Sequence, residues 1–237
     1  MAQDWAKKDL EKSPRHLEWV DVKLGQRTVK CFVAYPEVTH KARTVLVIHE
    51  IFGLTDWVRS LTDQLAEAGY VAIAPDLLGD TEKLGGDDAA RKAIASLAPD
   101  QITADLKAVA AYATHLPASN GELSVVGFCW GGTQSFRFAT NHSDLKSALV
   151  FYGSAPTDPG ELARVSCPVF GFYAENDARI NQTLEETRRQ MAQKKFEPVI
   201  YTAAGHGFMR AGQAPDASPA NRQARQDAWK RIRLILK

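Results

Sequence analysis

Short apolar runs, rich in β-branched and aromatic residues, recur along this chain and are separated by segments with helical periodicity. Each run is largely continuous rather than alternating, which is typical of a strand buried on both faces of a parallel sheet. Strands that alternate with helices predict an α/β chain with a mostly parallel sheet and helices on both of its faces. The runs are residues 44–49, 70–74, 123–126, 148–152 and 169–173.

The remaining segments complete this pattern. Residues 16–24 and 27–35 alternate in polarity around Gly25-Gln26, which predicts an N-terminal antiparallel hairpin. Residues 198–202 form a last strand, and residues 79–99 are rich in Gly and Asp at first and then helical. We expect one domain that covers residues 1–237, a normal length for an α/β domain. Helices are predicted at 5–12, 55–68, 101–116, 133–140, 181–194 and 218–236.

Composition excludes several classes of function. The chain has 29 basic and 28 acidic residues, a balance without the positive footprint of a nucleic-acid-binding protein. No apolar run is long enough to span a membrane, so we expect no membrane partner. Three cysteines without close pairs predict neither a disulfide framework nor a zinc site. The predicted compartment is the cytoplasm, or the periplasm if an export signal was removed. The second possibility arises because residues 1–4 read like a start methionine added to a chain that had been cut after a small residue.

The hexapeptide Gly127-Phe128-Cys129-Trp130-Gly131-Gly132 joins a predicted strand to a predicted helix. This is the setting of a nucleophile elbow, with cysteine where serine usually stands. The glycines avoid collisions at a sharp turn, and a helix N-terminus favours a thiolate. On this motif alone, a buried cysteine that acts only as a small hydrophobic residue is an equally good interpretation.

Polar residues follow three other predicted strands, and the carboxyl ends of parallel strands share one edge of a sheet. The chain order is Cys129, Asp177 and His206, which is the nucleophile, acid and histidine order of α/β-hydrolases. We expect Cys129 to attack an acyl carbon, His206 to move the thiol proton and Asp177 to orient the imidazole. The backbone N–H groups of Trp130 and Ile51 are the candidates for an oxyanion hole.

Other residues compete for these roles. Glu175 is an alternative to Asp177 as the acid, although Asp177 lies better placed beyond its strand. Asp76 also ends a strand, but it favours a local turn cap. His49 is expected to be a packed or hydrogen-bonded neighbour rather than a base. Tyr152, at the end of a strand beside the elbow, could line an acyl pocket.

From about residue 16 onward the chain resembles the dienelactone hydrolase family. The resemblance rests on residues 48–54, on 74–77, on the elbow at 127–132, on Asp177 and on 205–208. It implies an α/β-hydrolase three-layer sandwich, a monomer, no cofactor and no metal. The implied substrate is a small ester or lactone, and the family's own lactone bears a carboxylate.

The resemblance also implies roles for four residues. Cys129 is the nucleophile, and Glu50 contacts the resting thiol and helps to generate the thiolate only when substrate arrives. A carboxylate beside a thiol opposes its ionisation, so such a resting enzyme would resist oxidation. Arg210 and Arg91 are the candidates to grip the substrate carboxylate.

The leading hypothesis is therefore a cofactor-independent hydrolase of small esters or lactones that forms a thioester at Cys129. One alternative is a non-catalytic binding module that keeps the fold. Another alternative is a thiol-based redox sensor, although no second cysteine stands near Cys129 in the sequence.

Overall fold

The computed structural model describes residues 3–237. The chain divides into two compact units, Met1–Leu123 and Ser124–Lys237, which are described in turn. Residues 1 and 2, on which the interpretation of a removed export signal partly depends, lie outside the described part of the chain.

The first unit contains a sheet with the strand order β1-β2-β4-β3. The expected N-terminal hairpin is confirmed, since β1 and β2 pair antiparallel around the turn at Gly25, whose φ of 57° is left-handed. Strand β2 also pairs antiparallel with β4, whereas β3 and β4 are parallel. The bounds are β1 (Leu17–Leu24), β2 (Arg27–Ala34), β3 (Ala42–Ile48) and β4 (Val71–Pro75).

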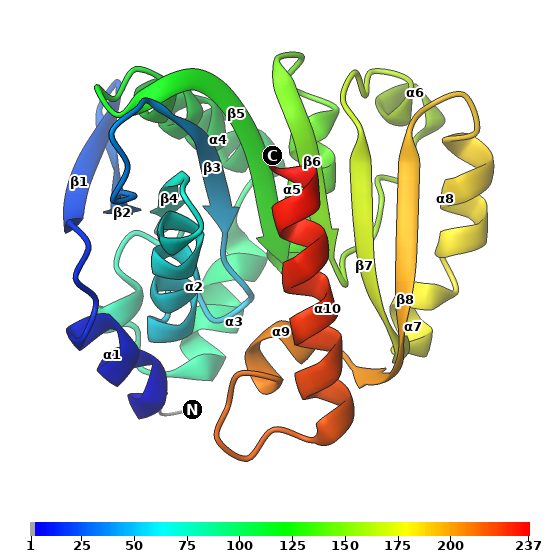
Figure 1. Ribbon diagram of the computed structural model, residues 1–237. Helices are drawn as coiled ribbons and strands as arrows, with labels where there is room; N and C mark the ends of the chain where they lie inside the picture. Colours follow the sequence, from blue (N-terminus) through cyan, green and yellow to red (C-terminus); the bar gives the residue numbers. More distant parts are fainter. Residues whose placement is uncertain (1–2) are drawn as a thin grey trace. The chain divides into compact units, whose positions relative to one another are not determined.

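Two helices cover the sheet of the first unit. Helix α2 (Asp56–Glu67) and helix α4 (Pro99–Thr114) both pack against its strands and lie on opposite faces of it (Figure 1). Helix α2 buries Trp57, Leu61 and Leu65, which recur at the three- to four-residue spacing of one helix face. The other helical segments of this unit are α1 (Asp4–Glu11), η1 (Thr81–Lys83) and α3 (Asp87–Ser96).

His49 follows β3 and is completely buried. Its Nδ1 lies 2.7 Å from the carbonyl oxygen of Glu50, and the Leu77 N–H donates to its Nε2 over 3.3 Å. Because Nε2 accepts, the proton of the neutral ring resides on Nδ1 and is donated to Glu50. Burial lowers the pKa of His49. His49 is thus a hydrogen-bonded core residue, as the sequence predicts.

Asp76 caps the turn after β4. Its carboxylate accepts hydrogen bonds from the backbone of Leu78 and from both the N–H and the hydroxyl of Thr81, over 2.6 to 3.1 Å. All of these partners lie within five residues, so the prediction of a local cap is confirmed.

The second unit holds the strand order β5-β6-β7-β8, where β5 (Ser119–Phe128) enters it at Ser124. Strands β6 (Leu145–Phe151), β7 (Val169–Asn176) and β8 (Phe196–Gly205) are parallel. Helix α5 (Trp130–Ala139) packs on β6 and helix α10 (Pro219–Ile235) on β8, on opposite faces (Figure 1). A cluster of aromatic rings fills the core near the carboxyl ends of the strands, with Phe151 stacked on Phe172 at 4.1 Å between centroids.

The helix predicted at 181–194 is shorter, since α8 spans Leu184–Gln190, and a separate single turn, α7 (Ala178–Asn181), precedes it. Asn181 ties the end of α7 to β7, because its side-chain amide donates to the carbonyl oxygens of Ala174 and Glu175 over 2.8 and 3.2 Å. Helices α6 (Pro159–Leu162) and α9 (Phe208–Ala211) are single turns.

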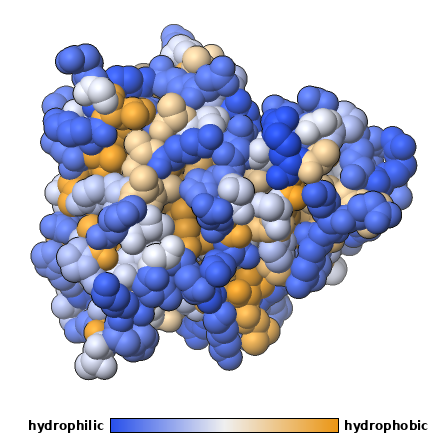
Figure 2. All heavy atoms as spheres, turned by 90° about the horizontal axis from the view of Figure 1, so that it is seen from above, coloured by the Kyte–Doolittle hydropathy of each residue, from blue (hydrophilic) through white to orange (hydrophobic). Residues whose placement is uncertain are grey.

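Hydrophilic side chains cover most of the face drawn in Figure 2, and apolar residues emerge there only in small areas. Among the described residues, no helix is both long and apolar enough to cross a membrane. The exposed large apolar side chains include Val199 and Ile200 on the edge strand β8.

Candidate active site

Cys129 occupies the sharp turn between β5 and α5. Its φ of 57° and ψ of −116° are unusual for a residue with a side chain, and such a conformation costs about 1–3 kcal/mol. Two backbone hydrogen bonds hold it in place: Cys129 N–H donates to the Phe151 carbonyl over 3.0 Å, and Thr133 N–H donates to the Cys129 carbonyl over 3.2 Å. The elbow predicted from the sequence is therefore present.

Three glycines allow this turn. A Cβ on Gly127 would overlap the carbonyl oxygen of Gly131, and one on Gly132 would overlap the carbonyl oxygen of Phe151. A Cβ on Gly153, just after β6, would overlap the backbone of Gly132 and Thr133. The elbow motif revealed the first two positions, whereas Gly153 lies outside it and was missed. Its position directly after a buried strand was the available signal.

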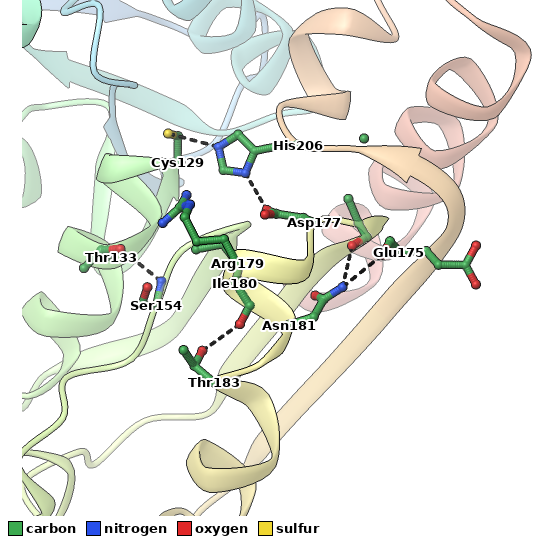
Figure 3. Close-up of polar contacts among 12 residues, drawn as sticks. Cys129, Thr133, Ser154, Glu175, Asp177, Arg179, Ile180, Asn181, Thr183 and His206 are labelled. Carbon is green, nitrogen blue, oxygen red and sulfur yellow. Dashed lines mark hydrogen bonds and ion pairs between the residues drawn. The ribbon is translucent and has the colours of Figure 1, made fainter.

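Cys129, His206 and Asp177 are hydrogen bonded in series (Figure 3). His206 Nε2 lies 3.1 Å from Cys129 Sγ, and His206 Nδ1 lies 2.5 Å from Asp177 Oδ2. The Asp177 side chain is 7% exposed and that of His206 is 33% exposed, so the carboxylate is shielded from solvent while the imidazole stays accessible. Asp177 follows β7 and His206 follows β8, so the parallel strands bring both to the edge where β5 delivers Cys129.

Glu175 does not face His206. Its carboxylate accepts a hydrogen bond from the Ala203 N–H over 2.7 Å, while Asn176 Nδ2 donates to the Ala203 carbonyl over 3.1 Å. The two side chains thus hold one residue near the carboxyl end of β8, three residues before His206. Ala203 has a φ of 56°, a left-handed conformation that an alanine adopts only when its surroundings impose it. We call these two contacts the Ala203 clamp.

The same end of β8 is also held from α10. The Asn221 side chain accepts a hydrogen bond from the Gly205 N–H over 2.9 Å. His206 is therefore preceded by backbone fixed at both Ala203 and Gly205. Sequence reasoning missed Asn221, because no local motif connects a position inside the last helix with the end of the strand that precedes His206.

Tyr152 lies beside the imidazole. It is fully buried, with its ring centroid 5.0 Å from that of His206 and 5.4 Å from that of Phe208. Its φ of 39° is left-handed, and its N–H donates to the Phe172 carbonyl over 2.8 Å. Tyr152 thus supports one face of the His206 ring. Arg210, one helical turn after His206, is partly buried on α9.

Three of the residues singled out from the sequence belong to the first unit. Glu50 is buried, Ile51 is partly exposed, and the guanidinium of Arg91 lies 5.0 Å from the ring centroid of Phe52. Their expected roles toward Cys129 stay predictions. Trp130, in the second unit, is the first residue of α5, and the N–H groups of a first helical turn point out of the helix N-terminus.

The series of thiol, imidazole and carboxylate is suited to acyl transfer. A thiol within hydrogen-bond reach of an imidazole, itself oriented by a carboxylate, is the arrangement of an activated nucleophile. Over residues 3–237 no group of three or more His, Cys, Asp or Glu side chains is placed to hold a metal ion.

Comparisons with known proteins agree with this architecture. A curated relative from Salmonella typhi, provisionally named carboxymethylenebutenolidase, is 34% identical over 204 residues, covering 79% of this chain and 74% of the relative. One of the same provisional name from Methylorubrum extorquens is 31% identical over 234 residues, covering 90% and 78%. A crystal structure provisionally named dienelactone hydrolase, from Klebsiella pneumoniae, superposes with a TM-score of 0.83 at 26% identity, covering 94% of this chain and 98% of that one.

The fold is that of the α/β-hydrolases, with the N-terminal antiparallel hairpin that the sequence predicts. Residues 29–237 match the family model described as "Dienelactone hydrolase family". This match spans most of the chain and includes the elbow, the acid and the histidine. The chain belongs to the dienelactone hydrolase family, whose members are hydrolases of lactones.

Proposed function

We propose that this protein hydrolyses small esters or lactones through a thioester on Cys129, with His206 as the base and Asp177 as the orienting acid. The observation that carries the proposal is the 3.1 Å contact between His206 Nε2 and Cys129 Sγ, with Asp177 on the opposite ring nitrogen. Because Nδ1 donates its proton to Asp177, Nε2 is the nitrogen left to accept a proton from the thiol.

Acylation transfers one proton and forms one bond. The thiol proton moves to His206 Nε2 as Sγ attacks the carbonyl carbon, and the carbonyl oxygen becomes an oxyanion. The tetrahedral intermediate then collapses, and the leaving alkoxide takes the proton from the imidazolium. For a lactone, the alcohol released is the far end of the same molecule.

Deacylation reverses the roles. A water molecule gives its proton to His206 Nε2 and attacks the thioester carbon. The thiolate leaves, and the proton returns from the imidazolium to sulfur, so the free enzyme is regenerated with a carboxylic acid product. No cofactor or metal enters this scheme.

The remaining assignments belong to the same proposal. The N–H groups of Trp130 and Ile51 would bind the oxyanion, and Glu50 would hold the resting thiol until substrate arrives. Tyr152, Arg210 and Arg91 would contact the substrate. We further propose that the chain acts as a monomer and as one domain.

The test is hydrolysis of 4-nitrophenyl acetate by Cys129→Ala, which should lose turnover, since the thiol that forms the thioester is absent. Intact mass spectrometry of Asp177→Asn mixed with this ester should reveal an acetyl adduct that peptide mapping assigns to Cys129. Wild-type activity in Cys129→Ala would overturn the proposal.

Cys167→Ala is the matched control. Cys167 is buried, and burial raises the pKa of its thiol to about 11, so it remains a protonated thiol at neutral pH. Activity in this variant should equal that of the wild type, which assigns the loss in Cys129→Ala to one particular thiol.

The geometry gives no support to a redox sensor that forms a Cys129–Cys167 disulfide. The Cys129 backbone N–H donates to the carbonyl of Phe151, at the carboxyl end of β6, whereas Cys167 precedes the amino end of β7. At about 3.3 Å per residue, these ends are separated by roughly 15 Å, and a disulfide requires Cα atoms within about 7 Å.

A further inference from the structure

Arg179 stands on α7, two residues after Asp177. The orientation of this short helix is fixed, because Ile180 is buried against Tyr173 and Leu184 and the Asn181 amide is bonded to β7. In Figure 3 the Arg179 side chain extends from α7 towards Cys129 and His206, away from the buried side of the helix. It was not among the residues singled out from the sequence.

The charge of Arg179 is not neutralised within the protein. Its side chain is exposed, and over residues 3–237 it makes no ion pair. The two carboxylates nearest to it in sequence are engaged elsewhere, Asp177 with His206 and Glu175 with the Ala203 N–H. Arg189 on α8 differs, because its guanidinium pairs with Glu186 at 2.6 Å.

A guanidinium presents its donors in a planar fork that matches the two oxygens of a carboxylate, and it holds less hydration water than an ammonium. The guanidinium of Arg179 makes no ion pair within residues 3–237 and extends towards Cys129 (Figure 3). It can therefore bind an anionic group of a substrate whose carbonyl carbon lies next to the Cys129 sulfur. We propose that Arg179 binds a carboxylate of the substrate and makes the site selective for charged over neutral esters. This inference rests on the proposed function of the same site.

The test compares matched pairs of chromogenic esters. Mono-(4-nitrophenyl) glutarate and its methyl ester place a carboxylate or a neutral group on the acyl side. 5-Acetoxy-2-nitrobenzoate and its methyl ester instead place the carboxylate or the neutral group on the leaving group. For at least one pair, Arg179→Gln should lower kcat/KM for the anionic ester about tenfold and for the neutral ester less than twofold. Arg179→Lys should retain part of the preference, since it keeps the charge but not the fork.

Arg189→Gln is the matched control, because it removes an exposed arginine of the same unit that is already paired; it should leave both pairs unchanged. Added salt should erode the wild-type preference and leave Arg179→Gln unaffected, since the interaction is partly exposed. An equal loss of kcat/KM for anionic and neutral esters, or no loss in either pair, would overturn the inference.

Failure of this inference can be told apart from failure of the proposed function. Glutarate can be titrated into Cys129→Ala, with and without Arg179→Gln, by calorimetry. Weaker glutarate binding in the double variant supports the anion site irrespective of turnover, and equal binding contradicts it. Activity retained by Cys129→Ala contradicts the thioester mechanism alone.

Discussion

Removal of one side chain of the Ala203 clamp tests whether the end of β8 that precedes His206 is held by residues other than Cys129, His206 and Asp177. Glu175→Ala deletes the acceptor of the Ala203 N–H, and Glu175→Gln keeps an oxygen acceptor but removes its charge. The bond is 2.7 Å long and holds a residue whose left-handed φ is unfavourable for alanine. Loss of the clamp should therefore let this backbone relax and displace His206.

The expected magnitudes follow from the bond type. A hydrogen bond to a charged group contributes about 1.5–3 kcal/mol to stability. Because Glu175 is exposed, we expect a contribution of about 1.5 kcal/mol from its bond to Ala203. A neutral amide acceptor contributes about 1 kcal/mol. Glu175→Ala should thus lower Tm by about 3–6 °C and Glu175→Gln by about 1–2 °C. If the whole loss of free energy is added to the activation barrier through displacement of His206, kcat falls about tenfold for Glu175→Ala and about twofold for Glu175→Gln.

The assay is the pH profile of kcat and kcat/KM with 4-nitrophenyl acetate, together with thermal unfolding. A clamp predicts lower kcat with an unchanged pH midpoint and partial rescue by glutamine. Glu185→Ala, which removes an exposed carboxylate from α8, should change neither quantity. Wild-type kcat in Glu175→Ala would refute the positioning role. A Glu175→Gln variant as inactive as Asp177→Asn would instead make Glu175 the catalytic acid.

Three further outcomes are expected. Asp177→Asn should lower kcat about 10³-fold or more while thermal unfolding stays cooperative, because an amide stabilises neither the required tautomer nor the imidazolium of His206; a tenfold loss or less would contradict its role. Gly132→Ala should fold poorly or lose activity, since its Cβ overlaps the Phe151 carbonyl, and a crystal structure with Cys129 unmoved would refute this. Burial lowers the pKa of His49, so the unfolded chain binds its proton more readily. The contribution of His49 to the free energy of unfolding should therefore be fully present above about pH 6.5 and be lost as the pH falls below it. Denaturant titrations should find this loss reduced in His49→Gln.

Much of the fold could be predicted from the sequence because its strands are continuous apolar runs and its hairpin alternates. The prediction was less accurate for the short helices after β7. The helix expected at 181–194 is only α8, and the turn before it, α7, is tied to β7 by Asn181, a tertiary contact that periodicity cannot reveal. Whether the two units form one domain stays a prediction.

Within the candidate site, the sequence could place Cys129, Asp177 and His206 because each directly follows a recognisable strand. It could not decide firmly between Asp177 and Glu175, which are two residues apart. That choice depends on the bulge near the end of β7, where pairing with β8 shifts between Ala174 and Asn176. The direction of Arg179 was likewise invisible, because the side-chain orientation on a single-turn helix has no periodic signature.

The contact between Cys129 and Phe151 has a consequence for engineering this chain. Cys129 directly follows β5, but its backbone N–H is tied to the carbonyl of Phe151 at the end of β6, and Gly132 and Gly153 let the two segments meet. The position of the Cys129 sulfur is therefore set in part by β6, a strand that does not precede Cys129 in the elbow. A one-residue insertion or deletion after Phe151 would move Cys129 as surely as one in the elbow, so grafts of this candidate site need both segments together.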